Sequence, residues 1–367
     1  MNLFFAIFLI FQFMREGSEP FSLILPLYIE ERRNLYSSHA DFINKLSNFE
    51  TAGTISKQDM IIFVLQNGEI YEYYDLKFKK IISLESGVIS PPKLYNDVLY
   101  IGTISGELVA ISVNNKEILW KQKLFNRPIL SPPAIIEEFI ILKSPNDDLL
   151  LIDSKNGETK KIIKNDESPE YKVITFSPPV IDEKNGIVFY GTHTGNLNAV
   201  DLEFKSLWKI KLKEGYRSFT GTPIIGENIV AISLGGKYII GVDKKTGKKI
   251  WEEEIKNIAG VESYKGEIFV VSQDGAFNSF DINDGKKICK KKLRIKGITE
   301  ISISEDGKII IGTSSGHLYI LDRNFKILQR IKLEGGISSP ISIFRRGIGV
   351  LTDTGNAYVF VGKDYDR

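Results

Sequence analysis

The chain has 367 residues, of which 43% are hydrophobic and 26% charged, so it holds enough apolar material for a large buried core. Its 48 Lys and Arg residues nearly balance its 46 Asp and Glu residues, and a formal net charge of +2 gives no overall electrostatic reason to expect nucleic acid as a partner. The single cysteine, Cys289, excludes an intrachain disulfide and every zinc, iron–sulfur or haem site that needs two or more thiols.

The chain begins with a separate apolar segment, residues 1–17. Met1 to Met14 are almost all apolar, and fourteen helical residues would span about 21 Å, short of the roughly 30 Å hydrocarbon core of a bilayer. The length suits a secretory signal or a weak anchor, although no Lys or Arg precedes it and no small-residue cleavage site follows. A buried terminal strand and a true start at Met14 are the alternatives. No cysteine lies nearby, so we do not expect a lipid-modified N-terminal cysteine.

Residues 18–367 are expected to form a single domain. Phe21 to Leu35 have the apolar content of a strand, and Tyr36 to Phe49 form a polar linker. From about Glu50 onward one pattern recurs: a short apolar strand, a turn containing glycine, a second apolar strand, a polar turn and a third strand. The clearest copies are Val98–Ile111, Ile187–Asp201, Ile268–Asp281 and Ile309–Asp322.

The turn glycines set the period of the repeat. They are Gly68, Gly106, Gly195, Gly236, Gly275, Gly316 and Gly355, with Asp147 at the one position that lacks glycine. Successive spacings of 38, 41, 48, 41, 39, 41 and 39 residues average 41, and the long spacing contains the polar insertion Asn165–Tyr171. The apolar runs are short and rich in Val, Ile, Tyr and Phe, which favours strands over helices. Glycine suits a tight hairpin turn because it tolerates positive φ.

A further strand precedes each hairpin and follows a recurrent proline motif, as in Ser90-Pro91-Pro92. Proline cannot donate a ladder hydrogen bond, so the motif predicts the start or the edge of a sheet. Four strands in about 41 residues are typical of a β-propeller blade. The region from Glu50 to Arg367 is one strand short of eight such units, since only 12 residues follow Gly355. We therefore predict an eight-bladed propeller whose last blade is completed by the strand in residues 21–35.

The polar turns carry a more specific signature, Asp then Thr-Gly-Lys then Trp, as in Asp243 to Trp251. This repeat resembles the quinoprotein, or pyrroloquinoline quinone (PQQ), propeller repeat of quinoprotein alcohol dehydrogenases and BamB-type outer-membrane assembly lipoproteins. The resemblance implies that Trp120, Trp208 and Trp251 dock between blades. At the equivalent positions of four other repeats, Trp is replaced by Ile82, Lys161, Cys289 and Gln329. We expect weaker packing around blade 3, where the ammonium group of Lys161 must reach solvent.

Catalytic chemistry finds little support in the residues. A quinoprotein dehydrogenase, as the resemblance implies, needs a calcium site, an Asp base and in many members a vicinal cysteine pair, which one cysteine excludes. Glu262, Glu300 and Arg217 are the candidates for an axial channel site that could bind a small ligand or cation, although charged residues are ordinary around a solvated channel. His39, His193 and His317 are far apart and are expected in linkers or exposed turns.

The sequence therefore predicts a non-enzymatic scaffold with no cofactor and no metal. By resemblance to BamB, it would bind protein partners in the cell envelope, in outer-membrane protein assembly, as a monomer with peripheral membrane or envelope association and without nucleic acid. The alternatives are a PQQ-binding dehydrogenase and a propeller that senses a small ligand. Location is predicted outside the cytoplasm, or in the cytoplasm if residues 1–17 are a strand or a wrong start.

Overall fold

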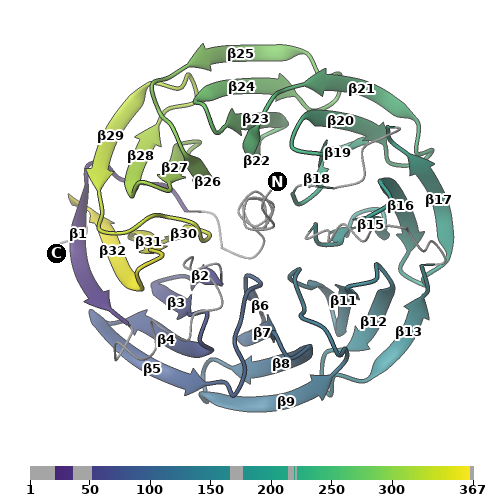
Figure 1. Ribbon diagram of the computed structural model, residues 1–367, viewed down its shortest axis with the longest axis horizontal. Helices are drawn as coiled ribbons and strands as arrows, with labels where there is room; N and C mark the ends of the chain where they lie inside the picture. Colours follow the sequence, from purple (N-terminus) through teal and green to yellow (C-terminus); the bar gives the residue numbers. More distant parts are fainter. Residues whose placement is uncertain (1–20, 36–51, 166–176, 214–218, 220, 364–367) are drawn as a thin grey trace.

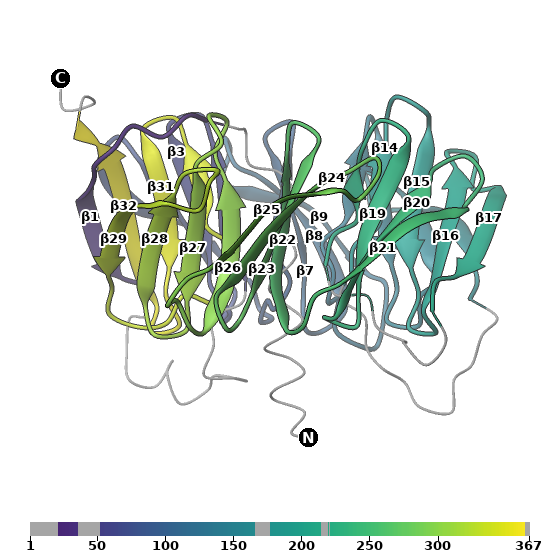
Figure 2. The same cartoon turned by 90° about the horizontal axis from the view of Figure 1, so that it is seen from above.

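The computed structural model describes residues 21–35, 52–165, 177–213, 219 and 221–363. They form 32 strands in eight four-stranded antiparallel sheets, arranged as the blades of a ring (Figure 1). The prediction of an eight-bladed, all-β propeller is confirmed. Figure 2 shows the strands running between the two faces of the disc. The described part of the chain has no helix with the length and apolarity needed to cross a membrane.

Blades 1 to 7 are each built from strands that follow one another in the chain, the first lying nearest the axis and the last at the rim. The first four blades are blade 1, β2 (Gly53–Lys57), β3 (Met60–Val64), β4 (Glu69–Tyr74) and β5 (Lys77–Ser83); blade 2, β6 (Lys93–Tyr95), β7 (Val98–Gly102), β8 (Glu107–Ser112) and β9 (Glu117–Lys123); blade 3, β10 (Ala134–Ile136), β11 (Phe139–Lys143), β12 (Leu149–Asp153) and β13 (Thr159–Ile163); and blade 4, β14 (Val180–Asp182), β15 (Ile187–Gly191), β16 (Asn196–Asp201) and β17 (Ser206–Lys211).

The second half of the ring repeats this order until the last blade. Its members are blade 5, β18 (Ile224–Ile225), β19 (Ile229–Leu234), β20 (Tyr238–Asp243) and β21 (Lys249–Glu254); blade 6, β22 (Ile258–Tyr264), β23 (Glu267–Ser272), β24 (Ala276–Asp281) and β25 (Lys287–Lys292); blade 7, β26 (Ile298–Ile303), β27 (Ile309–Thr313), β28 (His317–Leu321) and β29 (Ile327–Lys332); and blade 8, β30 (Ser342–Phe344), β31 (Gly347–Leu351), β32 (Asn356–Gly362) and β1 (Leu27–Asn34).

Burial explains why the middle strands are almost continuously apolar. Each blade packs a neighbour against both of its faces, so strands such as β15 and β31 are buried along their whole length. The rim strands have a free side. In β9, for example, most side chains on both faces are exposed. The core is accordingly divided into clusters that lie between blades, one of which joins Phe189 of blade 4 to Val230 of blade 5.

The turns follow the predicted chemistry. All seven turn glycines have φ between +62° and +89°, and Asp147 takes the same conformation with φ of +64°. The proline motifs directly precede the innermost strands, so the prediction of a strand start is confirmed. Hydroxyls near the axis join neighbouring blades: Thr54 Oγ1 donates to Pro340 O at 2.9 Å, and Ser177 Oγ donates to Gly221 O at 2.6 Å.

The N-terminal strand closes the ring. β1 pairs antiparallel with β32 from Leu27 opposite Gly362 to Asn34 opposite Asn356, and Leu35 N donates to Gly355 O at 3.0 Å (Figure 1). Residues 21–27, which we call the strap, lie against blade 7: Leu23 N donates to Asp306 Oδ1 at 3.2 Å, and Leu23 and Leu27 enter the core between blades 7 and 8. The predicted closure is therefore confirmed, whereas residues 1–17 and 36–49 fall outside the described ranges.

Candidate functional site

The structure describes two of the three predicted axial residues. Glu262 lies on β22 and Glu300 on β26, the inner strands of adjacent blades; Glu300 is buried, Glu262 is half-buried, and each already has an interaction partner. Arg217 lies outside the described residues. Within the described ranges, no group of three or more His, Cys, Asp or Glu side chains is placed to hold a metal ion. Their axial role stays a prediction.

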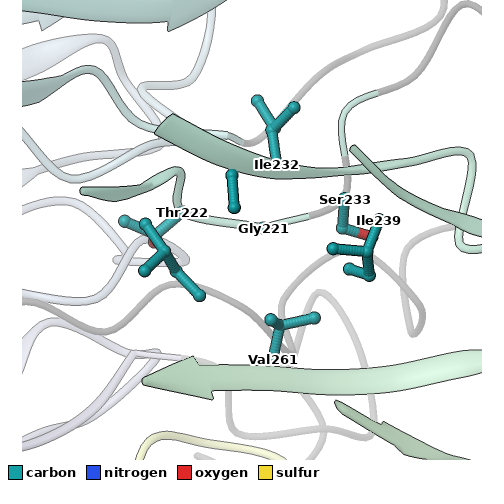
Figure 3. Close-up of a pocket in the computed structure, with 8 residues that line it drawn as sticks. Gly221, Thr222, Ile232, Ser233, Ile239 and Val261 are labelled. Atoms are coloured by element: carbon teal, nitrogen blue, oxygen red, sulfur yellow. The ribbon is translucent and has the colours of Figure 1, made fainter. Parts of the chain in front are cut away.

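A small hollow lies beside the inner strands of blades 5 and 6 (Figure 3). Its empty volume is about 210 Å³ with the open mouth included. Thr222 and Ser233 are the polar side chains among its lining residues, and both have other partners. PQQ carries three carboxylates and binds beside calcium, so this apolar lining does not fit it.

The three histidines differ in placement from one another. His39 lies outside the described residues, and His317 is half-buried, where burial, helped by Arg330 and Lys332, lowers its pKa. The expectation that His193 sits in an exposed turn is wrong, because its side chain is 8% exposed. It is buried because Asp147, in the turn of the preceding blade, accepts hydrogen bonds from both His193 Nδ1 and the His193 backbone N–H.

Asp147 is the centre of a buried charge cluster that the sequence did not reveal. Lys143 Nζ lies 3.6 Å from Asp147 Oδ1 and donates to Gly191 O at 3.0 Å. Burial opposes ionisation of Asp147, but the charge of Lys143 and the hydrogen bonds from His193 outweigh it and hold the pKa of Asp147 below its usual value. Burial lowers the pKa of Lys143, although Asp147 opposes that shift. The cluster links blade 3 to blade 4.

A second buried ion pair links blades 4 and 5. Lys244 Nζ lies 2.5 Å from Asp182 Oδ2, both side chains are 5% exposed, and the ammonium also donates to Gly226 O at 2.9 Å. Burial raises the pKa of Asp182, but hydrogen bonds from Lys244 and Asn185 more than offset this and leave the pKa below the usual value. Because Lys244 follows Asp243 of the repeat motif, the motif itself places this cation at the junction.

The three tryptophans occupy equivalent junctions between blades. The indole N–H of each donates to a backbone carbonyl in the Asp turn of the next blade, meaning the turn between its third and fourth strands: Trp120 to Ser154 at 2.8 Å, Trp208 to Lys244 at 2.9 Å and Trp251 to Ile282 at 2.9 Å. Each ring also covers a turn glycine. A Cβ at Gly157 would lie 2.7 Å from the Trp120 ring, and Gly247 and Gly285 meet Trp208 and Trp251 in the same way.

Two junctions without tryptophan are filled from the opposite side. At the junction of blades 3 and 4, Lys161 replaces Trp, and the glycine of the next Asp turn is replaced by Phe204, which is 9% exposed with φ of +65°. Lys161 Nζ donates to Glu203 O at 3.0 Å, another carbonyl of the same turn. At the junction of blades 6 and 7, Cys289 is matched by the fully buried Phe325.

The remaining departures from Trp have their own partners. Blade 8 takes its last strand from the N-terminus and so has no Asp turn; Gln329 instead donates through Nε2 to Leu27 O at 2.7 Å and accepts from Leu27 N at 2.8 Å. At the junction of blades 1 and 2, Ile82 packs into the shared core, and Lys116 of the turn pairs with Glu72. Lys161 is exposed as predicted, but Phe204 fills the space where weaker packing was expected.

Comparison with known proteins identifies relatives by sequence. A family model described as outer membrane protein assembly factor BamB matches residues 75–291 and 205–329. Proteins of that name from Yersinia pestis and Shewanella oneidensis are 19% and 23% identical to this chain over 256 and 259 residues, which are 66% and 67% of the chain. The match spans 64% of the length of each of these relatives.

Solved structures share the fold. BamB from Moraxella catarrhalis superposes with a TM-score of 0.74 at 17% identity, covering 92% of this chain and 100% of that one. A europium-containing methanol dehydrogenase superposes with a TM-score of 0.72 at 11% identity, covering 91% and 93%. One architecture thus serves an assembly factor and an oxidoreductase, so the fold alone does not determine the function.

Proposed function

Because the chain belongs to the PQQ-type β-propeller family described as outer membrane protein assembly factor BamB, we propose that it is a non-enzymatic scaffold that binds other proteins of the cell envelope. The observation that carries the proposal is the match of the assembly-factor family model to residues 75–329, most of the ring. We extend the proposal to a monomer located outside the cytoplasm that takes part in outer-membrane protein assembly.

The chemistry of the described residues supports this choice over a dehydrogenase. The hollow in Figure 3 is small and largely apolar, the described acids form no metal-binding group, and one cysteine cannot form a vicinal pair. The junctions, by contrast, are filled by buried rings, hydrogen bonds and ion pairs. These contacts build a stiff ring, and a stiff ring presents its loops and rim to partners with little ordering cost on binding.

Chemical cross-linking in intact cells tests the scaffold. We expect a tagged copy of the chain to be cross-linked reproducibly to a defined envelope protein, and a strain without the gene to contain less folded outer-membrane protein. Purified protein mixed with PQQ and Ca²⁺ should show no bound-quinone absorbance and no dye reduction. Quinone binding with dye reduction, or recovery of the chain with cytoplasmic proteins alone, would contradict the proposal.

A further inference from the structure

The rim of blade 6 carries a dense positive strip. Residues 286–296 contain seven cationic side chains and no acidic one, and all seven are exposed: Lys286, Lys287, Lys290, Lys291, Lys292, Arg294 and Lys296. The strip follows β25, the outermost strand of its sheet, and continues into the connection to blade 7 (Figure 1). The next blade extends the positive surface with the exposed Arg323, Lys326, Arg330 and Lys332. The near-zero net charge of the chain conceals this local excess.

Little of this charge is neutralised within the described part of the ring. Lys287 pairs with Glu253 at 3.5 Å and Lys292 with Asp274 at 2.5 Å. Lys291 Nζ donates to the Asn324 backbone carbonyl at 3.4 Å. No described carboxylate lies within ion-pair distance of four members of the strip, listed here: Lys286, Lys290, Arg294 and Lys296.

Protection of a free strand edge explains only part of the strip. Charged residues on edge strands do prevent unwanted pairing. The adjacent rim strand β21 combines one lysine with three glutamates, whereas the rim strands β5, β13, β17 and β29 also carry cations without acids. The run at blade 6 is denser, with four lysines in the six residues of β25, and it continues past the end of the strand to Arg294 and Lys296. A run of one sign adds mutual repulsion that mixed charges avoid. The repulsion is relieved when an anionic partner binds.

The strip also has a shape and a chemistry that favour one class of partner. The outer edge of β25 pairs with no described strand, and Ile288, in the bulge of β25, is 57% exposed. A polypeptide is the polyanion that can use backbone hydrogen bonds, an apolar contact and cations together. The rim is convex in Figure 1, so a flat bilayer would touch few of these cations.

We propose that the β25 edge of blade 6 binds an extended acidic segment of a partner protein, added as a fifth strand to the blade. This inference rests on the proposed function, because it specifies which kind of segment the scaffold recognises. The acidic side chains lie along the cations of residues 286–296, and the partner's backbone pairs with the free edge. Ile288 provides the apolar contact between Lys287 and Lys290.

A fluorescent peptide of ten alternating Glu and Val residues tests the inference by anisotropy. The triple variant Lys286→Glu, Lys290→Glu and Arg294→Glu should weaken binding by roughly tenfold or more, because exposed ion pairs each contribute modestly and reversal adds repulsion. The control Lys77→Glu, Lys79→Glu and Lys248→Glu changes the net charge equally at exposed sites elsewhere and should leave binding unchanged. Methylating alternate peptide amides should also weaken binding, because strand pairing needs those N–H groups.

Several outcomes would overturn the inference. They are absence of peptide binding to the wild-type chain, equal losses in both triple variants, and indifference to amide methylation. Binding of phosphatidylglycerol vesicles or a single-stranded oligonucleotide to the strip in place of the peptide would do the same. Cross-linking in cells distinguishes failure of this site from failure of the scaffold proposal. If the peptide assay fails but the blade 6 variant is still cross-linked to its envelope partner, the β25 site is rejected and the scaffold proposal stands.

Discussion

At the scale of single residues, the five junctions from blade 2 to blade 7 follow a rule of exchange. Each of them has either a large ring on the rim strand and glycine in the next Asp turn, as with Trp120 and Gly157, or a smaller rim residue and phenylalanine in the turn, as with Lys161 and Phe204. The aromatic side chain therefore comes either from the rim strand of one blade or from the Asp turn of the next. Close packing requires this complementarity, because two rings would clash and none would leave a cavity.

The exchange rule predicts strong coupling between Lys161 and Phe204. Phe204→Gly alone should lose about 3–5 kcal/mol of unfolding free energy, as for removal of a buried phenyl ring. Lys161→Trp alone should also destabilise, because the indole meets Phe204. Combined, the two substitutions place the large ring on the rim strand and glycine in the turn, and a urea-denaturation double-mutant cycle should show a favourable coupling of about 1–3 kcal/mol. Additive effects would contradict the rule.

The buried pair of Asp182 and Lys244 predicts a second residue-scale effect. Asp182→Ala leaves an uncompensated buried ammonium and should cost about 3–5 kcal/mol of unfolding free energy. Adding Lys244→Met removes that charge and should recover most of the loss. Denaturation midpoints of the two variants provide the comparison. A double variant no more stable than Asp182→Ala would show that the pair is not the cause.

Acid stability should depend on Asp182 and Asp147. Both have a pKa below the usual value in the folded state, so their stabilisation is complete above the unfolded pKa of about 3.9 and is lost as pH falls through the folded values. Unfolding free energy should therefore drop more steeply below pH 4 for the wild type than for Asp182→Asn. Between pH 5 and 7 the two curves should run parallel. Equal slopes below pH 4 would rule out this contribution.

At the scale of elements, the strap and β1 explain the most unusual junction. Gln329 stands at a Trp position because blade 8 has no Asp turn, and its amide pairs with both backbone groups of Leu27. Restoring the family residue should therefore harm this junction. Gln329→Trp should lose about 1–3 kcal/mol in thermal or urea unfolding, since Leu27 N and O lose their partners.

A matched control separates this effect from general intolerance to tryptophan. Lys161→Trp in the Phe204→Gly background, where a turn carbonyl is present, should stabilise that background instead. Leu23→Ala should resemble Gln329→Trp in weakening the strap, whereas Ser22→Ala, at an exposed position, should change little. If Gln329→Trp stabilises the chain, the strap does not determine the identity of residue 329.

These elements also show where sequence reasoning succeeds and fails. Strands, turn glycines and blade count are encoded locally, so the period of 41 and the short end after Gly355 predicted eight blades and closure. The contacts that fill the junctions between blades are not local in sequence. Phe204, in the next repeat, fills the space beside Lys161, and Asp147 binds the buried His193 from 46 residues away. The segment from Asp201 to Trp208 is one residue shorter than the equivalent Asp243 to Trp251, but only the packed ring shows that this turn places Phe204 in the core.

At the scale of the whole molecule, the ring joins the first and the last described strands, β1 and β32. Each blade contacts two neighbours, so every junction depends on the circle being closed, and β1 provides that closure through its pairing with β32. The closed ring keeps the rim strands and the face loops in fixed positions. A scaffold that binds extended or folded partners needs this stiffness, which is why the closure underlies the functional proposals.

Native-state hydrogen exchange measured by mass spectrometry tests the closure most directly. If β1 is an integral strand of blade 8, the amides of residues 27–34 should be protected from exchange to the same extent as those of β32. As the denaturant concentration rises, the two strands should lose this protection together. Exchange of residues 27–34 at the rate of an unstructured peptide, while β32 stays protected, would show that the N-terminal strand does not close the ring.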